Sequence, residues 1–425
     1  MAHRAFVSKI TEVIEIPGAE SIQVAIVMGE RVIVSKEWGV GFEGILFPVD
    51  LQLSQDFCYE NNLHRHSDLN KDKTKKGFFD DNRRVRAQPF MKVKSEGFFA
   101  DKSCLDYLGT IDLKVGDQFD EINGKKVCEK YYNEQTKVAK GNASVKQAKK
   151  NYAPFFEKHV DSEQFKHYAQ SIPTGSLLSF HAKVHGTSAR MAHTLVEVDL
   201  PKWKQLVNKV YPLFATQKWD YVVGTRNVVL KDVGKEGWHG SEAFRFDVMN
   251  EVKPYLEKGM QIFGEIAGYA NGKPIMPKHS VEALKDKAFT KKYGKEVTYS
   301  YGCKETEYRF HVYRITYMNQ NGDNVDFSQK QLEKWCNDRG ITCTFEVHPQ
   351  MVYDGDVEKL RSLVESLTER PEVLCEDYID PTHLNEGIVL RVDSGKMKPE
   401  FYKSKSYCFK VMEGICETID TEDAN

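Results

Sequence analysis

Dense turn signals over the first 130 residues restrict what this part of the chain can fold into. Pro17-Gly18, Gly29-Glu30 and three glycines between residues 39 and 44 interrupt the sequence too often for helices of ordinary length. The runs between the turns are short and rich in Val and Ile, as strands are. They include Arg4–Val7, Gln23–Met28, Arg31–Ser35 and Ile45–Pro48. An Asn123-Gly124 pair adds a hairpin signal. The pattern predicts a small β-barrel over residues 1–130.

Two polar segments accompany this β-rich region. Residues 61–86 are predicted to form a long loop that carries Lys71, Lys73, Lys75, Lys76, Arg83, Arg84 and Arg86. Residues 137–150 hold five lysines and no acidic residue. We interpret residues 131–160 as a basic linker between domains, and contact of these lysines with phosphates is an open alternative.

Helices and strands are mixed from residue 161 onward. Helices are predicted to begin after Asp199-Leu-Pro and at the cap residue Ser328, and a third covers residues 357–367. The predicted strands are Gln261–Ile266, Tyr308–Thr316, Gly387–Val392 and Tyr407–Val411. The expected fold class is therefore α+β, with a second domain of antiparallel sheets flanked by helices over residues 161–416 and an acidic tail over residues 417–425.

Composition excludes several classes of protein. Lys and Arg number 60 against 62 acidic residues, so the net charge is −2 and a globally basic nucleic-acid coat is excluded. No window approaches the ~18 apolar residues of a membrane span, and the start of the chain lacks a secretion signal. Nine cysteines without a CxxC pair predict reduced thiols rather than disulfides or structural zinc. We expect a cytoplasmic protein with no membrane contact, and a monomer by default.

Residues 181–190, His-Ala-Lys-Val-His-Gly-Thr-Ser-Ala-Arg, are the most informative stretch for chemistry. Lys183 comes after a strand and precedes a turn at Gly186, so its side chain can be held rigidly at a pocket wall. A lysine with an ordinary pKa near 10.4 is a poor nucleophile unless its surroundings favour the free amine. A lone lysine beside a glycine is usually a surface residue, and a functional interpretation therefore requires further motifs downstream in the chain.

Five further motifs come after Lys183 in a fixed order. They are Thr225-Arg226-Asn227, Phe263-Gly264-Glu265, Phe310-His-Val-Tyr313, Glu386-Gly387 and Lys403-Ser404-Lys405. Together with the first motif they resemble the six collinear motifs of the covalent nucleotidyltransferase superfamily, which contains ATP-dependent ligases and capping enzymes. Only 20 residues come after Lys405, too few for the carboxy-terminal OB domain of DNA ligases and capping enzymes. The order, with a β-rich module first, is similar to the fifth family of ATP-dependent RNA ligases, in which an OB-like module precedes an ATP-grasp-like ligase domain.

This resemblance implies a reaction and assigns roles. Lys183 would attack the α-phosphate of ATP and form a lysyl-AMP, the AMP would pass to a 5′-phosphate, and a 3′-OH would displace it. Lys403 and Lys405 would act with Lys183 in catalysis. The residues implied to bind the nucleotide are Lys183, His185, Gly186, Arg190, Arg226, Asn227, Glu265, Phe310, Lys403 and Lys405. Glu265, Glu386 and His185 would bind Mg²⁺ or Mn²⁺.

Several of these roles have structural alternatives. Phe310 would stack on adenine, but it alternates with Val312 on a strand and ordinary core packing is a rival. Arg190 would bind a phosphate or face solvent. Many family members have Asp where this chain has His185, which leaves the metal role of that residue open. Tyr313-Arg314 replaces a common Phe-Asp pair.

The implied partner is RNA, with a nicked duplex bearing a 3′-OH RNA end as the expected form. A Lys-rich insertion over residues 272–307 and the basic segment of residues 61–94 are the candidate backbone-binding surfaces. Alternatives are a capping-type enzyme that uses GTP, a DNA ligase, and an RNA-binding protein without catalysis.

Overall fold

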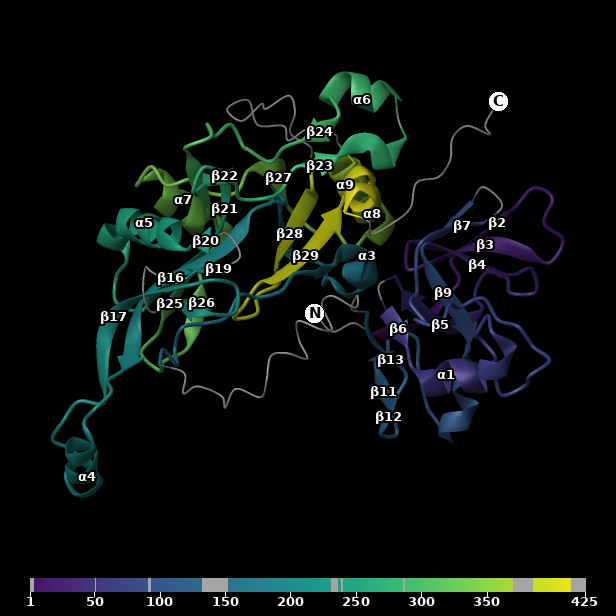
Figure 1. Ribbon diagram of the computed structural model, residues 1–425, viewed down its shortest axis with the longest axis horizontal. Coiled ribbons are helices and arrows are strands. Elements are labelled where there is room, and N and C mark those ends of the chain that lie inside the picture. The colour runs from purple at the N-terminus through teal and green to yellow at the C-terminus, as the bar shows by residue number, and fades with distance from the viewer. Residues whose placement is uncertain are drawn as a thin grey trace. The chain divides into compact units, whose positions relative to one another are not determined.

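The computed structural model describes residues 4–49, 51–90, 93–131, 152–230, 236–237, 240–285, 287–369 and 385–413. The chain divides into two compact units, each of which is considered by itself (Figure 1). The first unit comprises residues 1–146, 283–285 and 410–425, and the second comprises residues 147–282 and 286–409. Lys137–Lys150, Pro371 and the predicted acidic tail lie outside the described residues.

Short antiparallel strands build the first unit. One sheet has the order β10-β1-β5-β9, and a separate meander has the order β2-β3-β4. The bounds are β1 Ala5–Lys9, β2 Glu12–Glu15, β3 Ile22–Val27, β4 Glu30–Ser35, β5 Glu43–Pro48, β9 Gly97–Asp101 and β10 Gln118–Phe119. Two-stranded pairs are β6 Leu51–Leu53 with β13 Cys128–Lys130, β7 Gln88–Phe90 with β8 Val93–Ser95, and β11 Glu121–Ile122 with β12 Lys125–Lys126.

The predicted hairpin at Asn123-Gly124 is present, since both residues have positive φ angles (49° and 76°) between β11 and β12. The mixed α+β class is confirmed. A closed amino-terminal barrel is not shown, because the described strands of this unit pair in several separate sheets. The strands are short, and left-handed turns such as Met28-Gly29 end them. Each described strand therefore pairs with only one or two other strands.

Aromatic side chains fill the core of the first unit. Helix α1 (Gln55–Glu60) begins at Ser54, whose hydroxyl accepts a hydrogen bond from the Phe57 amide. The Phe57 ring packs on Phe47 at 5.1 Å, and Phe47 in turn stacks on Phe98 at 5.7 Å. These contacts bury apolar area between α1 and the main sheet.

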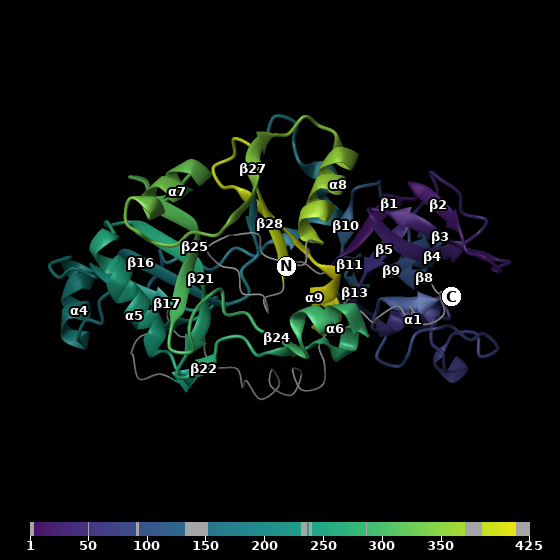
Figure 2. The same cartoon turned by 90° about the horizontal axis from the view of Figure 1, so that it is seen from above.

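Two sheets form the second unit (Figure 2). The five-stranded sheet has the order β14-β29-β28-β15-β27, with bounds β14 Glu163–Gln164, β15 Leu177–Ala182, β27 Glu346–Val352, β28 Gly387–Asp393 and β29 Glu400–Lys405. All its pairs are antiparallel except β14 with β29. Helix α8 (Val357–Thr368) packs Leu360 and Val364 into one core with Phe180 of β15.

The seven-stranded sheet has the order β18-β17-β16-β21-β25-β26, with β22 paired to β21. Its bounds are β16 Thr187–Glu197, β17 Gln217–Gly224, β18 Val229–Leu230, β21 Met260–Ala270, β22 Lys273–Pro274, β25 Tyr308–Met318 and β26 Asn324–Asp326. Helices α5 (Ala243–Val252) and α7 (Gln329–Asn337) share the core of one face of this sheet. The predicted cap Ser328 begins α7 with a full capping box.

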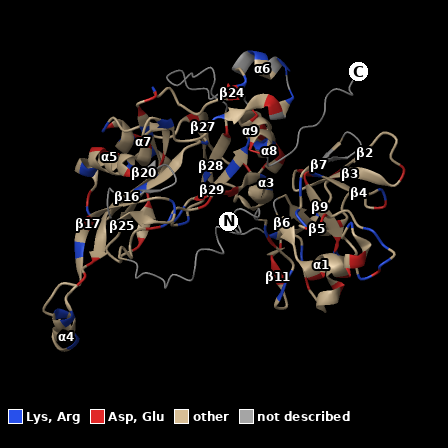
Figure 3. Ribbon diagram, in the orientation of Figure 1, with Lys and Arg blue, Asp and Glu red and all other residues tan. Residues whose placement is uncertain are grey.

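Smaller elements complete the second unit. Helix α4 (Lys202–Val210) lies at the far end of the β16–β17 hairpin, and Figure 3 shows its basic residues there. The others are α3 Phe165–Tyr168, α6 Lys287–Tyr293, and the pairs β19 Glu236–Gly237 with β20 Gly240–Ser241 and β23 His279–Ser280 with β24 Glu296–Val297. No helix of the described residues is long and apolar enough to cross a membrane.

The structure differs from two expectations about chain organisation. The predicted strand at residues 407–411 is helix α9 (Tyr407–Met412), because the Ser406 hydroxyl caps the Phe409 amide and the Phe409 ring is fully buried. The expected linker extends to residue 160, yet Ala153 and Phe156 are buried in a cluster with residues of β16 and β17. The second unit therefore begins before residue 160.

Candidate active site

Lys183 lies in a bend between the two sheets of the second unit. Strand β15 of the five-stranded sheet ends at Ala182, and β16 of the seven-stranded sheet begins at Thr187. The Lys183 amide donates to the Gly387 carbonyl at 2.9 Å, which fixes the start of the bend to β28. A Cβ atom at Gly186 would lie 2.5 Å from the Ile266 carbonyl oxygen, so the bend requires glycine.

Three basic side chains lie close to the carboxylate of Glu386. Its Oε1 lies 2.9 Å from Lys183 Nζ and 3.1 Å from Lys405 Nζ, and its Oε2 lies 3.2 Å from His185 Nδ1. The Glu386 side chain is only 1% exposed. Burial alone would raise the pKa of Glu386, but Lys183, the hydrogen bond from His185, and Lys405 together lower it below its ordinary value. Glu386 is therefore ionised at neutral pH.

The charge of Lys183 is set by its carboxylate neighbours. Burial lowers the pKa of a lysine, but attraction to Glu386 and Glu265 outweighs burial and raises the pKa of Lys183. In this structure Lys183 is an ammonium ion held by Glu386. A lysine in this state could act as a nucleophile only after the charge of its carboxylate neighbours is offset by a ligand.

Lys403 and Lys405 lie on one face of β29, two residues apart, as their alternation predicts. Lys405 reaches Glu386, whereas Lys403 is buried beside the two other lysines. Burial and, after it, repulsion from Lys183 and Lys405 lower the pKa of Lys403 to about 8. The positive charges of Lys183, Lys403 and Lys405, close to one another, favour the binding of an anion between them.

Glu265 supplies a second buried carboxylate from the seven-stranded sheet. It is directly opposite Ser188 of β16 and His311 of β25 in the sheet register. Its Oε2 is buried and has no hydrogen-bond partner among the described residues. Burial raises the pKa of Glu265 to about 7, although Lys183 opposes the rise. An unsatisfied buried oxygen of this kind is a site for a ligand hydroxyl or a cation.

His185 is oriented toward Glu386 by its surroundings. Its amide donates to the Tyr301 hydroxyl at 2.6 Å, and its ring meets the rings of Tyr299 and Phe409 at 4.4 and 4.9 Å. In the described contacts His185 Nδ1 lies 3.2 Å from Oε2 of the Glu386 carboxylate. A role as a metal ligand stays a prediction.

Arg226 and Asn227 come directly after strand β17 and are both exposed. Arg226 forms an ion pair with Asp161 and acts electrostatically on both Lys183 and Glu265. It therefore lies near the Lys183 cluster, where an arginine can contact a bound nucleotide. The described contacts connect Asn227 to none of these residues, and its role stays a prediction.

Arg190 points into the protein. It is 1% exposed, and its guanidinium donates to the carbonyl oxygens of Thr225 (2.6 Å) and Glu157 and lies 4.3 Å from the Phe156 ring. Burial lowers the pKa of Arg190 to about 10. These contacts favour a structural role over the phosphate contact that the sequence predicted.

Phe310 and Tyr313 of β25 lie on different faces of the sheet. Phe310 is directly opposite Ile266, is 7% exposed and belongs to the core beneath α5 and α7. Its ring occupies the space over Gly264, where a Cβ would lie 2.4 Å from it. The placement favours core packing over adenine stacking for Phe310.

Tyr313 is an aromatic residue on the Glu265 side of the charged cluster. Burial and the charge of Glu265 raise its pKa, and its hydroxyl lies 2.6 Å from His159 Nδ1. The pairing of β21 with β25 shifts register at Phe263/Gly264, opposite residues 312–314 of β25, and this shift lies between the positions of Phe310 and Arg314. Sequence reasoning missed Tyr313 and His159 as site residues, because only the sheet register distinguishes Tyr313 from Phe310.

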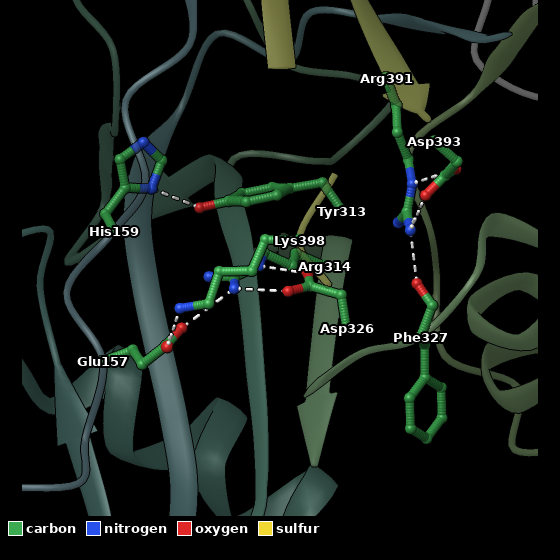
Figure 4. A network of polar contacts seen from close by, with 9 residues as sticks. All are labelled: Glu157, His159, Tyr313, Arg314, Asp326, Phe327, Arg391, Asp393 and Lys398. Carbon is green, nitrogen blue, oxygen red and sulfur yellow. Dashed lines mark hydrogen bonds and ion pairs between the residues drawn. The ribbon is translucent and has the colours of Figure 1, made fainter. Parts of the chain in front are cut away.

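Figure 4 shows the network that holds this region together. Arg314 donates to Asp326 at 2.7 Å and to Glu157 at 3.0 Å, and Glu157 also accepts from Lys398 at 2.7 Å. Nearby, Arg391 pairs with Asp393 at 2.9 Å and donates to the Phe327 carbonyl at 2.5 Å. Arg314 is buried, and Asp326 and Glu157 supply the opposite charges.

Comparisons with known proteins found a family model and solved structures that this chain resembles. The family model described as RNA ligase matches residues 179–412. Solved structures of Naegleria gruberi RNA ligase match over nearly the whole chain. An apo mutant has a TM-score of 0.56 at 16% identity and covers 96% of this chain and 99% of its own. The enzyme with PPi has a TM-score of 0.57 at 17% identity, with 96% and 98% covered. A mutant with AMP and Mn has a TM-score of 0.55 at 16% identity, with 95% and 97% covered.

The comparison with curated proteins found no match. The structural likeness at this low identity establishes the shared fold. The family model covers more than half of the chain, and its range contains Lys183, Glu265, Glu386 and Lys405. The chain therefore belongs to the RNA ligase family, and it is a polynucleotide ligase.

Proposed function

We propose that the protein is an ATP-dependent RNA ligase of the fifth family, which seals 3′-OH and 5′-phosphate RNA ends through a lysyl-AMP on Lys183. The observation that carries the proposal is the convergence of Lys183 and Lys405 on the buried Glu386, at 2.9 and 3.1 Å. Naegleria gruberi RNA ligase structures with ATP and Mn, with AMP and Mn, and with PPi support the choice of nucleotide and products.

In the first step the Lys183 amine attacks the α-phosphorus of ATP. An N–P bond forms, the bond to the bridging oxygen breaks, and pyrophosphate leaves with the electron pair. Lys183 must first lose its proton, so neutralisation of Glu386 is a precondition. Lys403 and Lys405 stabilise the negative charge that develops on the phosphate oxygens.

In the later steps the AMP passes to an RNA 5′-phosphate oxygen, which leaves Lys183 free, and a 3′-OH then attacks that 5′-phosphorus. The 3′,5′-phosphodiester forms as AMP leaves. Lys403 and Lys405 serve all three steps. In each step a nucleophile attacks one phosphorus in line with a leaving group, and negative charge develops on the phosphate oxygens that the lysines stabilise.

The site fits a divalent cation on its own chemistry. Glu386 and Glu265 are buried carboxylates, and one Glu265 oxygen has no hydrogen-bond partner among the described residues. Glu386 and Glu265, with His185 as a further candidate, would hold Mg²⁺ or Mn²⁺. Such a cation would reduce the attraction between Glu386 and Lys183 and would neutralise phosphate charge.

The adenosine of ATP would occupy the space bounded by Glu265, Tyr313 and Arg226. Tyr313 replaces Phe310 as our candidate for stacking on the base, and Glu265 or Arg226 would bind the ribose. Gly186 allows the close approach of the bend to β21. Asn227 remains a further candidate, whereas Arg190 has a structural role as the donor to the Thr225 carbonyl.

RNA is the proposed substrate, in the form of a nicked duplex with a 3′-OH RNA end, and a monomer is the proposed state. Residues 1–130 are proposed as an OB-like nucleic-acid-binding domain. Residues 161–416, together with Ala153 and Phe156 that pack against them, are proposed as the ligase domain, and the cytoplasm as the compartment. The basic segment of residues 61–94 and the Lys-rich residues 272–307 would contact phosphates in a salt-dependent manner.

The test is incubation with α-labelled ATP and Mg²⁺ or Mn²⁺ without nucleic acid, and then a denaturing gel. Wild type should acquire a covalent label, and Lys183→Ala should not, while Lys202→Ala on the remote helix α4 serves as the matched control. Labelled GTP runs in parallel. A label from GTP alone would assign capping chemistry, and no label from either nucleotide with folded, adduct-free protein would refute the proposal.

A further inference from the structure

Phe78 is a large apolar side chain that the first unit leaves in solvent. It is 56% exposed, although its neighbour Phe79 is only 6% exposed. It lies within residues 61–86, a segment with eight Lys or Arg and four Asp residues. An exposed aromatic ring within a positively charged segment is a common arrangement where proteins bind single-stranded nucleic acid.

The loop that carries Phe78 is held by internal contacts. The Asn70 side chain accepts from the His64 amide and donates to the His64 and Lys75 carbonyls, each at 2.9 Å, and Asn70 is fully buried. The Gly77 amide donates to the His64 carbonyl at 2.8 Å. A Cβ at Gly77 would lie 2.2 Å from the Leu63 backbone, so this close approach requires glycine. Phe78 therefore projects from a fixed backbone.

The ring itself is also held in place. Phe78 lies 4.7 Å from the Phe79 ring and 5.5 Å, edge to face, from the Phe98 ring. Tyr59, another exposed aromatic residue of this region, has Lys73 Nζ 5.8 Å from its ring centre. No cation of the described residues lies over the Phe78 ring in the same way. A preorganised ring loses little side-chain entropy when a ligand stacks on it.

Two cations close to Phe78 in the chain are available for phosphates. Lys75 and Lys76 precede Phe78 by three and two residues, are exposed, and form no ion pair among the described residues. By contrast, Arg65 of the same segment pairs with Asp80 at 2.9 Å. The charges of the two lysines therefore remain available for an anionic ligand.

We propose that Phe78 is a stacking site for an unpaired base of the RNA substrate, with Lys75 and Lys76 at the adjoining phosphates. The proposal rests on the proposed function and adds that the ligase reads a single-stranded nucleotide as well as duplex backbone. A single ring flanked by lysines is too small an apolar area for a stable protein interface. It also lacks the amphipathic helix that a membrane surface would require.

The test measures binding of a fluorescein-labelled 12-nucleotide RNA by anisotropy, beside the same RNA in a blunt duplex. Phe78→Ala should weaken single-strand binding by about 5-fold to 150-fold, the range for loss of one base–aromatic stack. Phe78→Trp should restore single-strand binding. The affinity of Phe78→Ala for the duplex should stay within twofold of wild type, and the control Val40→Ala, at an exposed position, should bind both RNAs as wild type does. Replacing Lys75 and Lys76 together by Ala should reduce the slope of log K against log salt by about 1.4, at ~0.7 for each single-strand phosphate.

Three results would overturn the proposal. Phe78→Ala could bind single strands as Val40→Ala does, or it could lose duplex and single-strand binding equally, which would indicate no base stacking. A change in oligomeric state with unchanged RNA binding would assign the ring to a protein contact. Because Phe78 and Lys183 belong to different units, calorimetric melting of the first unit serves as the check on folding. Because binding needs no catalysis, failure of wild type to form lysyl-AMP would refute the proposed function and leave this comparison intact.

Discussion

Glu265→Gln should stabilise the unliganded protein at alkaline pH and impair its reaction with ATP. Burial raises the pKa of Glu265 from its ordinary 4.5 to about 7. The folded protein therefore binds this proton more tightly than the unfolded chain does. Stability falls as the pH rises from about 4.5 to about 7, and the whole loss is present above that range. Glutamine has nearly the same shape and cannot ionise, so it avoids the loss.

The size of the effect is set by the difference between the two pKa values. At about 1.4 kcal/mol per pH unit, the difference between 4.5 and about 7 corresponds to about 3 kcal/mol. This value is an upper limit, since entry of water and relaxation of the site reduce it. A unit of this size shifts its midpoint by about 2–4 °C per kcal/mol, so the second unit should melt up to about 6–12 °C higher.

Calorimetry at pH 5 and pH 8 tests this reasoning, because it separates the melting of the two units. The gain for Glu265→Gln should be small at pH 5 and large at pH 8, and the exposed Glu257→Gln should show no such difference. Labelling by ATP should fall in the same variant. Equal gains at both pH values, or destabilisation at pH 8, would show that Glu265 is not an unsatisfied buried carboxylate.

Three further predictions concern the same site. Burial lowers the pKa of Lys403 to about 8, so its charge is present below that pH and lost above it; the Kd for ATP should rise above pH 8 by up to about tenfold per unit, and Lys403→Arg should flatten the profile. If the Kd for ATP depends on pH in the same way in wild type and in Lys403→Arg, Lys403 is not a phosphate contact. Arg190→Met should destabilise the second unit by about 2–5 kcal/mol in urea melts, because the partly buried carbonyls of Thr225 and Glu157 lose their donor, and ATP affinity of the folded variant should stay near wild type; a lost affinity without lost stability would restore the phosphate role. Tyr313→Leu should raise the KM for ATP, whereas Phe310→Leu should mainly lower the melting temperature, and the reverse pattern would return the stacking role to Phe310.

Local pattern was sufficient to predict the elements that carry several candidate site residues. Lys183 lies at the end of a strand beside an obligatory glycine, Glu265 lies within a strand, and Glu386 directly precedes one. Lys403 and Lys405 share a strand face, since alternation is a property of the backbone itself. Ser328 begins its helix because a hydroxyl at that position satisfies an amide of the first turn.

The tertiary structure decided what the pattern left open. Residues 407–411 form a helix because Ser406 caps it and the core takes up Phe409, although their β-branched and aromatic content favours a strand. Arg190 is buried against carbonyl oxygens rather than aimed at a ligand. Phe310 belongs to the core beneath α5 and α7, whereas Tyr313 lies beyond a register irregularity, and no single strand encodes the register of its neighbours.

The sequence by itself determined on which kind of element each candidate site residue lies, because turns and strand alternation depend on neighbours in the chain. Only the tertiary structure decided that Lys183, Lys405 and His185 meet at Glu386, with Glu265 close by. The physical reason is that the charge state of each group depends on burial and on partners up to about two hundred residues away, and these are properties of the folded sheets alone.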